Sequence, residues 1–131
     1  MNNFGQYAII DGVKHEFEKE PSWWWKIKPV TSKMELSMSK YMACVDEPGR
    51  RARAPMEIAF HEIALTFDGT NIPADPEKPV KDGGDPIVKP DASAEQVEIV
   101  LGLMPADMLM EIWAAVGKSY PYWGPANPNS K

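Results

Sequence analysis

The side chains that could support catalysis are few, and their spacing does not suit the reactions they resemble. His61 and Glu62 begin the zinc-binding pattern H-E-x-x-H, but Leu65 stands where the second histidine belongs. A hydrolytic zinc ion at this place would lack a ligand, so we interpret His61 as a helix-surface residue paired with Glu57 one turn earlier. Cys44 lies near the expected end of a helix, where the helix dipole does not favour a reactive thiolate.

Patterns for phosphate binding and for glycoside hydrolysis are also missing. The residues GKS at 117–119 match only the end of the P-loop pattern, because Ile112 stands where its first glycine belongs. The acidic pair at 46–47 falls in an expected turn, so nothing holds two carboxyl groups across a cleft. We therefore predict a protein that is not an enzyme, with no catalytic residues, no metal and no cofactor.

Composition narrows the remaining classes of protein. The chain has 131 residues, of which 44% are hydrophobic and 25% charged, as in one globular domain. Its net charge of −5, from 14 basic and 19 acidic side chains, argues against a general nucleic-acid binder. The sequence has one cysteine, no long apolar run and no signal-like N-terminus. We expect neither a disulfide framework, nor a membrane span, nor secretion.

Aromatic and cationic clusters are the best candidates for contacts with another protein. Three consecutive tryptophans lie between Pro21 and Pro29, and a Tyr-Trp pair lies among the prolines near the C-terminus. Because prolines keep both segments out of regular core elements, we expect these aromatic residues to make interface contacts. Three arginines form the densest cationic cluster, with a solvated loop as the alternative interpretation. The predicted partner-binding residues are Trp23, Trp24, Trp25, Arg50, Arg51, Arg53, Tyr122 and Trp123.

We predict that these residues are positioned by a mainly α fold with a small N-terminal β-hairpin. The hairpin covers residues 7–17, with a type I′ turn at Asp11-Gly12. The aromatic segment 18–30 is expected to be irregular. A compact bundle of about four helices and a long proline-rich loop complete the fold. The expected parts of this single domain are 1–30 (hairpin and aromatic arm), 32–70 (first helical pair), 73–91 (loop or linker), 93–117 (second helical pair) and 118–131 (C-terminal tail).

Capping signals place the ends of the helices. Ser32 and Glu35 have capping-box spacing for a helix that runs to about Cys44. Pro55 fits the first position of the second helix, and Asp68-Gly69 is expected to end it. The third helix begins after Ser93, with Gln96 at the matching position, and the fourth begins at Pro105. Gly117 and Lys118 are interpreted as the end of the fourth helix.

Three stretches of the sequence resemble a known family. They are WWWKIKPVTSKMEL, PMEIAFHEIALTFDGTNIP and MPADMLMEIWAAVGKSYPYWGP. Together they resemble elements of the tail assembly chaperones of long-tailed bacteriophages. Neck and connector subunits of phages show a similar pattern. The proline-rich segment 73–91 has no counterpart in the family, so the number of helices between the two halves stays open.

The resemblance implies a mostly helical protein without a catalytic site. Such chaperones coat the tape-measure protein in the host cytoplasm before the tail tube forms, and the major tail protein is a further expected partner. They often occur in two forms related by a ribosomal frameshift, of which this chain would be the shorter. The alternatives are a neck or head–tail connector subunit, and a small inhibitor of a host enzyme. An unpaired hairpin edge makes a homo-oligomer a further expectation.

Overall fold

The computed structural model describes residues 12–43, 54–120 and 122–125. Four α-helices and a three-stranded antiparallel sheet account for most of these residues, which confirms a mainly α protein with a small β part. The strands are β1 (Val13–Glu16), β2 (Trp24–Ile27) and β3 (Phe67–Thr70). The helices are α1 (Ser32–Met42), α2 (Pro55–Thr66), α3 (Ala94–Leu103), α4 (Ala106–Ser119) and the short 3-10 helix η2 (Val80–Asp82).

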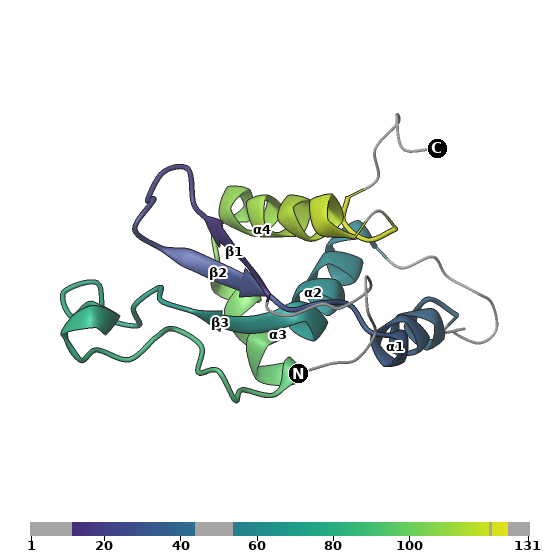
Figure 1. The fold of residues 1–131 in the computed structure, drawn as a ribbon, viewed down its shortest axis with the longest axis horizontal. Helices are drawn as coiled ribbons and strands as arrows, with labels where there is room; N and C mark the ends of the chain where they lie inside the picture. Colours follow the sequence, from purple (N-terminus) through teal and green to yellow (C-terminus); the bar gives the residue numbers. More distant parts are fainter. Residues whose placement is uncertain (1–11, 44–53, 121, 126–131) are drawn as a thin grey trace, which may run out of the picture.

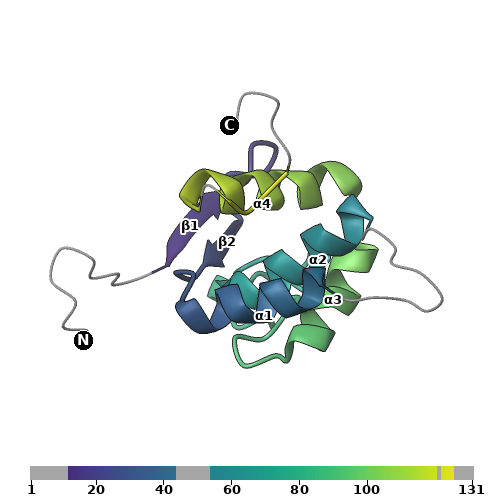
Figure 2. The ribbon, with the colours of Figure 1, turned by 90° about the vertical axis from the view of Figure 1, so that its right-hand side faces the viewer.

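Helix α2 is central to the arrangement of the helices. It packs against α1, α3 and α4, and its residues Ala59 and Ile63 are fully buried. Helix α4 lies across the β1–β2 hairpin, as Figure 1 shows, and α1 stands on the far side of α2 from the sheet. Figure 2 views the molecule from the α1 side, with α4 above α1 and α2. The main core therefore forms where α2, α4 and the sheet meet.

The aromatic segment contains the central strand of the sheet, so the prediction that 18–30 is irregular is wrong for residues 24–27. Strand β2 pairs with β1 on one side and with β3 on the other. Its alternation buries Trp25 and Ile27 completely and leaves Trp24 half-buried on the opposite face. Three adjacent tryptophans are compatible with this strand because neighbouring side chains point to opposite faces.

The predicted hairpin is confirmed only in its second arm. Residues 13–16 form β1, but the strand that pairs with β1 is β2, and the expected first arm at 7–10 lies outside the described residues. Among the described glycines, those with positive φ are Gly69, Gly83 and Gly124. The predicted type I′ turn at Asp11-Gly12 includes Asp11, which lies outside the described residues, so this part of the prediction is not tested. A Cβ atom at Gly12 would lie 2.5 Å from the carbonyl oxygen of Ile27, so this glycine permits close approach of the chain to β2.

The first two helices differ from prediction at their ends. Helix α1 has its N-cap at Thr31 rather than at Ser32, because the Thr31 hydroxyl accepts the Met34 N–H at 3.3 Å. Helix α2 begins at Pro55 as predicted. It ends at Thr66, and the chain continues directly into β3, so Asp68-Gly69 lies in a strand instead of a terminating turn.

The proline-rich segment 73–91 folds back on itself and on the residue Ile72 that follows β3, so it is not an open tether. Pro73 and Pro86 form an antiparallel bridge, and the Ile87 N–H donates to the carbonyl oxygen of Ile72 at 2.7 Å. Val88 is buried. Apart from the short η2 turn, the segment has no helix, in agreement with its proline content.

The second helical pair follows the predicted pattern at its start. Ser93 and Gln96 form the expected capping box of α3. Helix α4 begins at Ala106, one residue later than predicted, because Pro105 is its N-cap. Helix α4 continues to Ser119, so the prediction that Gly117 ends this helix is wrong.

Candidate functional site: an apolar groove between α1, α2 and the end of α4

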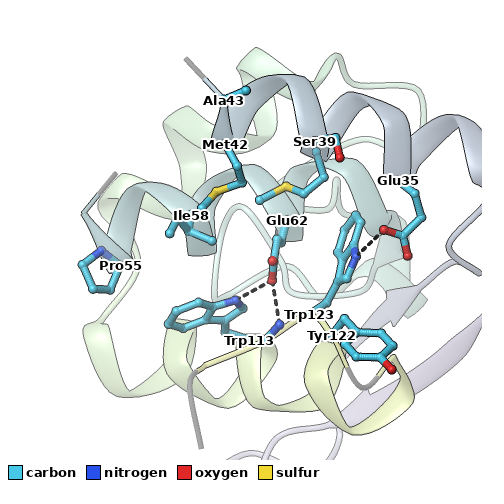
Figure 3. A pocket seen from close by; sticks show the side chains of 12 residues that line it. Glu35, Ser39, Met42, Ala43, Pro55, Ile58, Glu62, Trp113, Tyr122 and Trp123 are labelled. Atoms are coloured by element: carbon cyan, nitrogen blue, oxygen red, sulfur yellow. Dashed lines mark hydrogen bonds between the residues drawn. The ribbon is translucent and has the colours of Figure 1, made fainter. Parts of the chain in front are cut away.

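An open groove with a volume of about 630 Å³ lies between α1, the first half of α2 and the C-terminal half of α4 (Figure 3). Its walls are mainly apolar, with two methionines from α1 and aromatic rings from α4 and the chain that follows it. The lining residues are Glu35, Met38, Ser39, Met42, Ala43, Pro55, Ile58, Glu62, Trp113, Tyr122, Trp123 and Gly124. The groove has the character of a docking surface for an apolar chain.

Helical spacing explains how these side chains meet. Met38 and Met42 are one turn apart on α1 and so lie on the same face. Ile58 and Glu62 are likewise one turn apart on α2. Figure 3 shows Met42 above Ile58 and the Glu62 side chain reaching toward Trp113 of α4. The groove is therefore built by one face from each of three helices.

Glu62 is a buried carboxylate at the bottom of the groove, with 4% of its surface exposed. Its Oε1 atom accepts the indole N–H of Trp113 at 2.8 Å and the backbone N–H of Gly124 at 2.7 Å. Among the described residues, none donates a hydrogen bond to Oε2. Burial raises the pKa of this carboxyl group, and the two hydrogen bonds oppose the rise in part. The side chain thus ties α2 to α4 and to the C-terminal residues.

The chain reverses direction after α4 and closes one end of the groove with Trp123. The Trp123 N–H donates to the carbonyl oxygen of Tyr120 at 2.9 Å, and its indole N–H donates to Glu35 at 3.3 Å. Gly117 and Gly124 pack directly together: a Cβ atom on Gly124 would lie 2.4 Å from Cα of Gly117. Gly117 is therefore required for close packing inside α4 rather than for ending it.

The tryptophans predicted to bind a partner are distributed over different environments. Trp25 is fully buried, which corrects the expectation that it is available for contacts: it packs in the core against Phe67, with ring centroids 4.8 Å apart. Trp24 is half-buried, with the Lys14 ammonium group 4.3 Å from its ring centroid. Trp23 lines a smaller hollow formed with the proline-rich segment. None of these three residues lines the groove.

The predicted Tyr-Trp pair does belong to the groove. Tyr122 is 95% exposed at its rim, whereas Trp123 is buried within it. Arg50, Arg51 and Arg53 lie outside the described residues, as does Cys44. Of the predicted partner-binding residues, the structure therefore brings Tyr122 and Trp123 to one surface.

His61 has different partners from the one expected. Its ring stacks on Tyr41 with centroids 3.9 Å apart, and its Nδ1 atom lies 3.9 Å from a carboxylate oxygen of Glu98. Glu57 instead accepts the backbone N–H of Ala54 and caps the start of α2. In the described parts of the chain, no three histidine, cysteine or carboxylate side chains are grouped so that they could hold a metal ion.

Sequence reasoning missed the groove itself and the role of Glu62. The available signal was the placement of Glu62 one turn after Ile58 and one turn before Thr66, within a largely apolar helix. A carboxylate on a buried helix face needs nearby donors. The donors are Trp113 and Gly124, which lie 51 and 62 positions after Glu62 in the chain. They could therefore not be identified from the local sequence.

Comparisons of the chain with protein-family models, with curated proteins and with solved structures found no match. None of the helices within the described ranges has the length and apolar character needed to cross a bilayer.

Proposed function

We propose that this protein is a non-enzymatic helper that binds apolar helical segments of another protein in the groove. The observation that carries the proposal is an open, mainly apolar groove whose walls come from α1, α2 and the end of α4. Helix-in-groove binding uses such a surface, because the apolar face of an amphipathic helix is removed from water when it docks. Met38 and Met42 supply unbranched, adaptable side chains that suit ligands of varying sequence.

The more specific proposal is a tail assembly chaperone that keeps the tape-measure protein of a long-tailed phage soluble during assembly. It is supported by the location of the three stretches that resemble this family. Glu35 comes from the first stretch, Ile58 and Glu62 from the second, and Trp113 and Trp123 from the third. Each of the three stretches therefore contributes at least one residue to the same groove. A long helical protein with apolar stretches is a suitable ligand for that surface.

Co-expression with the tape-measure protein of the same genome tests this function, and Met42→Glu is the informative variant. Met42 lines the groove but is 45% exposed, so the charge should weaken docking without preventing folding. Leu103→Glu is the matched control, because Leu103 is 82% exposed on α3 and does not line the groove. The wild type and Leu103→Glu should keep the long protein soluble and co-purify with it, whereas Met42→Glu should not.

Equal recovery of the long protein with and without this chain would contradict the chaperone function. Mass spectrometry of purified virions separates the proposal from a connector subunit. An assembly chaperone should be missing from finished particles, and a stoichiometric amount of the chain in the virion would favour the connector.

A further inference from the structure

Among the described residues, the charged side chains that line the groove are all acidic. Two carboxylates, Glu35 and Glu62, lie in it, and no lysine, arginine or histidine is among its described lining residues. The two carboxylates come from neighbouring helices, α1 and α2, and both receive indole N–H groups from the aromatic wall. The groove therefore combines apolar walls with a negative potential.

Glu62 has one carboxylate oxygen, Oε2, that accepts no hydrogen bond from the described chain and that is not among its fully buried atoms. Both of its hydrogen bonds use Oε1, and no described donor reaches Oε2. A buried carboxylate without a positive partner is costly, because two neutral N–H groups replace only part of its hydration. The raised pKa of Glu62, caused first by burial, agrees with this incomplete compensation. A cation on a ligand would supply the positive partner that the carboxylate of Glu62 lacks among the described residues.

We propose that the groove selects helices that carry a lysine or arginine on their apolar face, with the cation bound by Glu62 Oε2. This inference rests on the proposed function and specifies its ligand. The aliphatic stem of such a side chain would pack against Met42 and Ile58, as long basic side chains do on apolar surfaces. Glu35 reinforces the negative potential, and the ring of Trp113 offers a face for cation–π contact.

A displayed library of amphipathic helices, randomised on the apolar face, provides the test. The wild-type protein should enrich helices with one lysine or arginine on that face. The tightest binder is then synthesised together with a variant that has methionine at the basic position. On the wild type the basic peptide should bind about tenfold more tightly, as a charge-assisted hydrogen bond in a partly desolvated site predicts. On Glu62→Gln the preference should fall to about twofold or less.

The outcomes separate this inference from the function on which it rests. Selected helices without a basic residue, or an unchanged preference on Glu62→Gln, would overturn the inference and leave groove binding intact. If no helix is selected, groove binding fails too. The wild type alone gives a second measurement, because added salt should reduce the preference for the basic peptide. A preference independent of salt would count against the proposal.

Discussion

Two glutamates, Glu62 on α2 and Glu111 on α4, join distant segments of the chain in similar ways. Glu62 accepts N–H groups from Trp113 and Gly124 at the groove. Glu111 accepts a hydrogen bond from Nε2 of His15 at 2.6 Å and another from the backbone N–H of Glu18 at 3.0 Å, which ties α4 to the sheet. The difference lies in charge and burial. Glu111 has an imidazole partner and a side chain that is 22% exposed, whereas Glu62 has two neutral donors and is almost completely buried.

This difference separates a structural contact from a candidate binding contact. The carboxylate of Glu111 has a partner that can carry positive charge and has access to water, so a ligand would add little to it. The carboxylate of Glu62 lies in a groove open to a ligand and lacks such a partner among the described residues. Similar hydrogen bonds therefore leave the carboxylate of Glu111 with a partner that can be cationic and the carboxylate of Glu62 open to a cation from a ligand.

The largest predicted effect comes from removing the groove carboxylate. Glu62→Ala leaves the Trp113 indole and the Gly124 amide without their acceptor, which should lower the free energy of unfolding by about 3 kcal/mol. Glu62→Gln retains an acceptor oxygen and should remain within about 1 kcal/mol of wild type. Urea unfolding followed by circular dichroism measures both variants. Equal losses of stability in the two variants would show that the charge of Glu62, rather than its hydrogen bonds, holds α2 and α4 together.

A smaller loss is expected from Gly117→Ala. The added Cβ would lie 2.7 Å from the carbonyl oxygen of Trp123, so the turn after α4 must shift, at a cost of about 2 kcal/mol. Gly102→Ala is a matched control, because no atom lies within 4 Å of its added Cβ in the exposed face of α3. That control should be neutral or stabilising, by up to about 1 kcal/mol. Thermal unfolding of the two variants makes the comparison, and similar melting temperatures would contradict the close packing of Gly117 with Gly124.

Glu111→Ala should cost less than Glu62→Ala. The site is partly exposed, so water can replace part of what is lost, and we expect a loss of about 1 kcal/mol. The same urea experiment provides the value. A loss of stability larger than that of Glu62→Ala would contradict the expectation that the buried Glu62 contributes more to stability than the partly exposed Glu111.

The smallest predicted effect is a difference between Glu62→Gln and the wild type in how the free energy of unfolding depends on pH. Burial places the pKa of Glu62 above its usual value of 4.5. The folded protein therefore binds this proton more tightly than the unfolded chain, and the resulting stability is lost as the pH rises through the folded pKa. Glu62→Gln lacks this term, so its stability relative to wild type should be greater at pH 7 than at pH 4. Unfolding measurements at the two pH values test the sign, and a constant difference would contradict a raised pKa.

Local signals in the sequence predicted the elements that depend on them. The capping box at Ser93 and Gln96 located the start of α3, and Pro55 located the start of α2. Strand β2 was not predicted, because it is stabilised by pairing with β1 and β3, which a local pattern does not show. The prolines at 21 and 29 instead favoured an irregular segment. Strand β3 was missed because the apolar pattern of α2 extends through Phe67.

The candidate site was predictable only in part. Tyr122 and Trp123 stood out because aromatic residues among prolines are unusual, and both line the groove. Trp25 had the same local features, yet it is fully buried, because burial depends on how the sheet packs on the helices. In the sequence, Glu62 is recognisable only as the second residue of an incomplete H-E-x-x-H zinc pattern. Its position in the groove depends on α4 and on the turn after it, which local patterns do not specify.

Binding of an apolar helix in the groove is tested most directly by the indole N–H signals of the tryptophans. A peptide from the tape-measure protein, or one selected from the helix library, is titrated into isotope-labelled protein and followed by NMR. The indole signals of Trp113 and Trp123 should shift with the peptide concentration, while that of Trp25, buried in the core and outside the groove, should stay in place. Binding that leaves Trp113 and Trp123 unchanged would contradict the account.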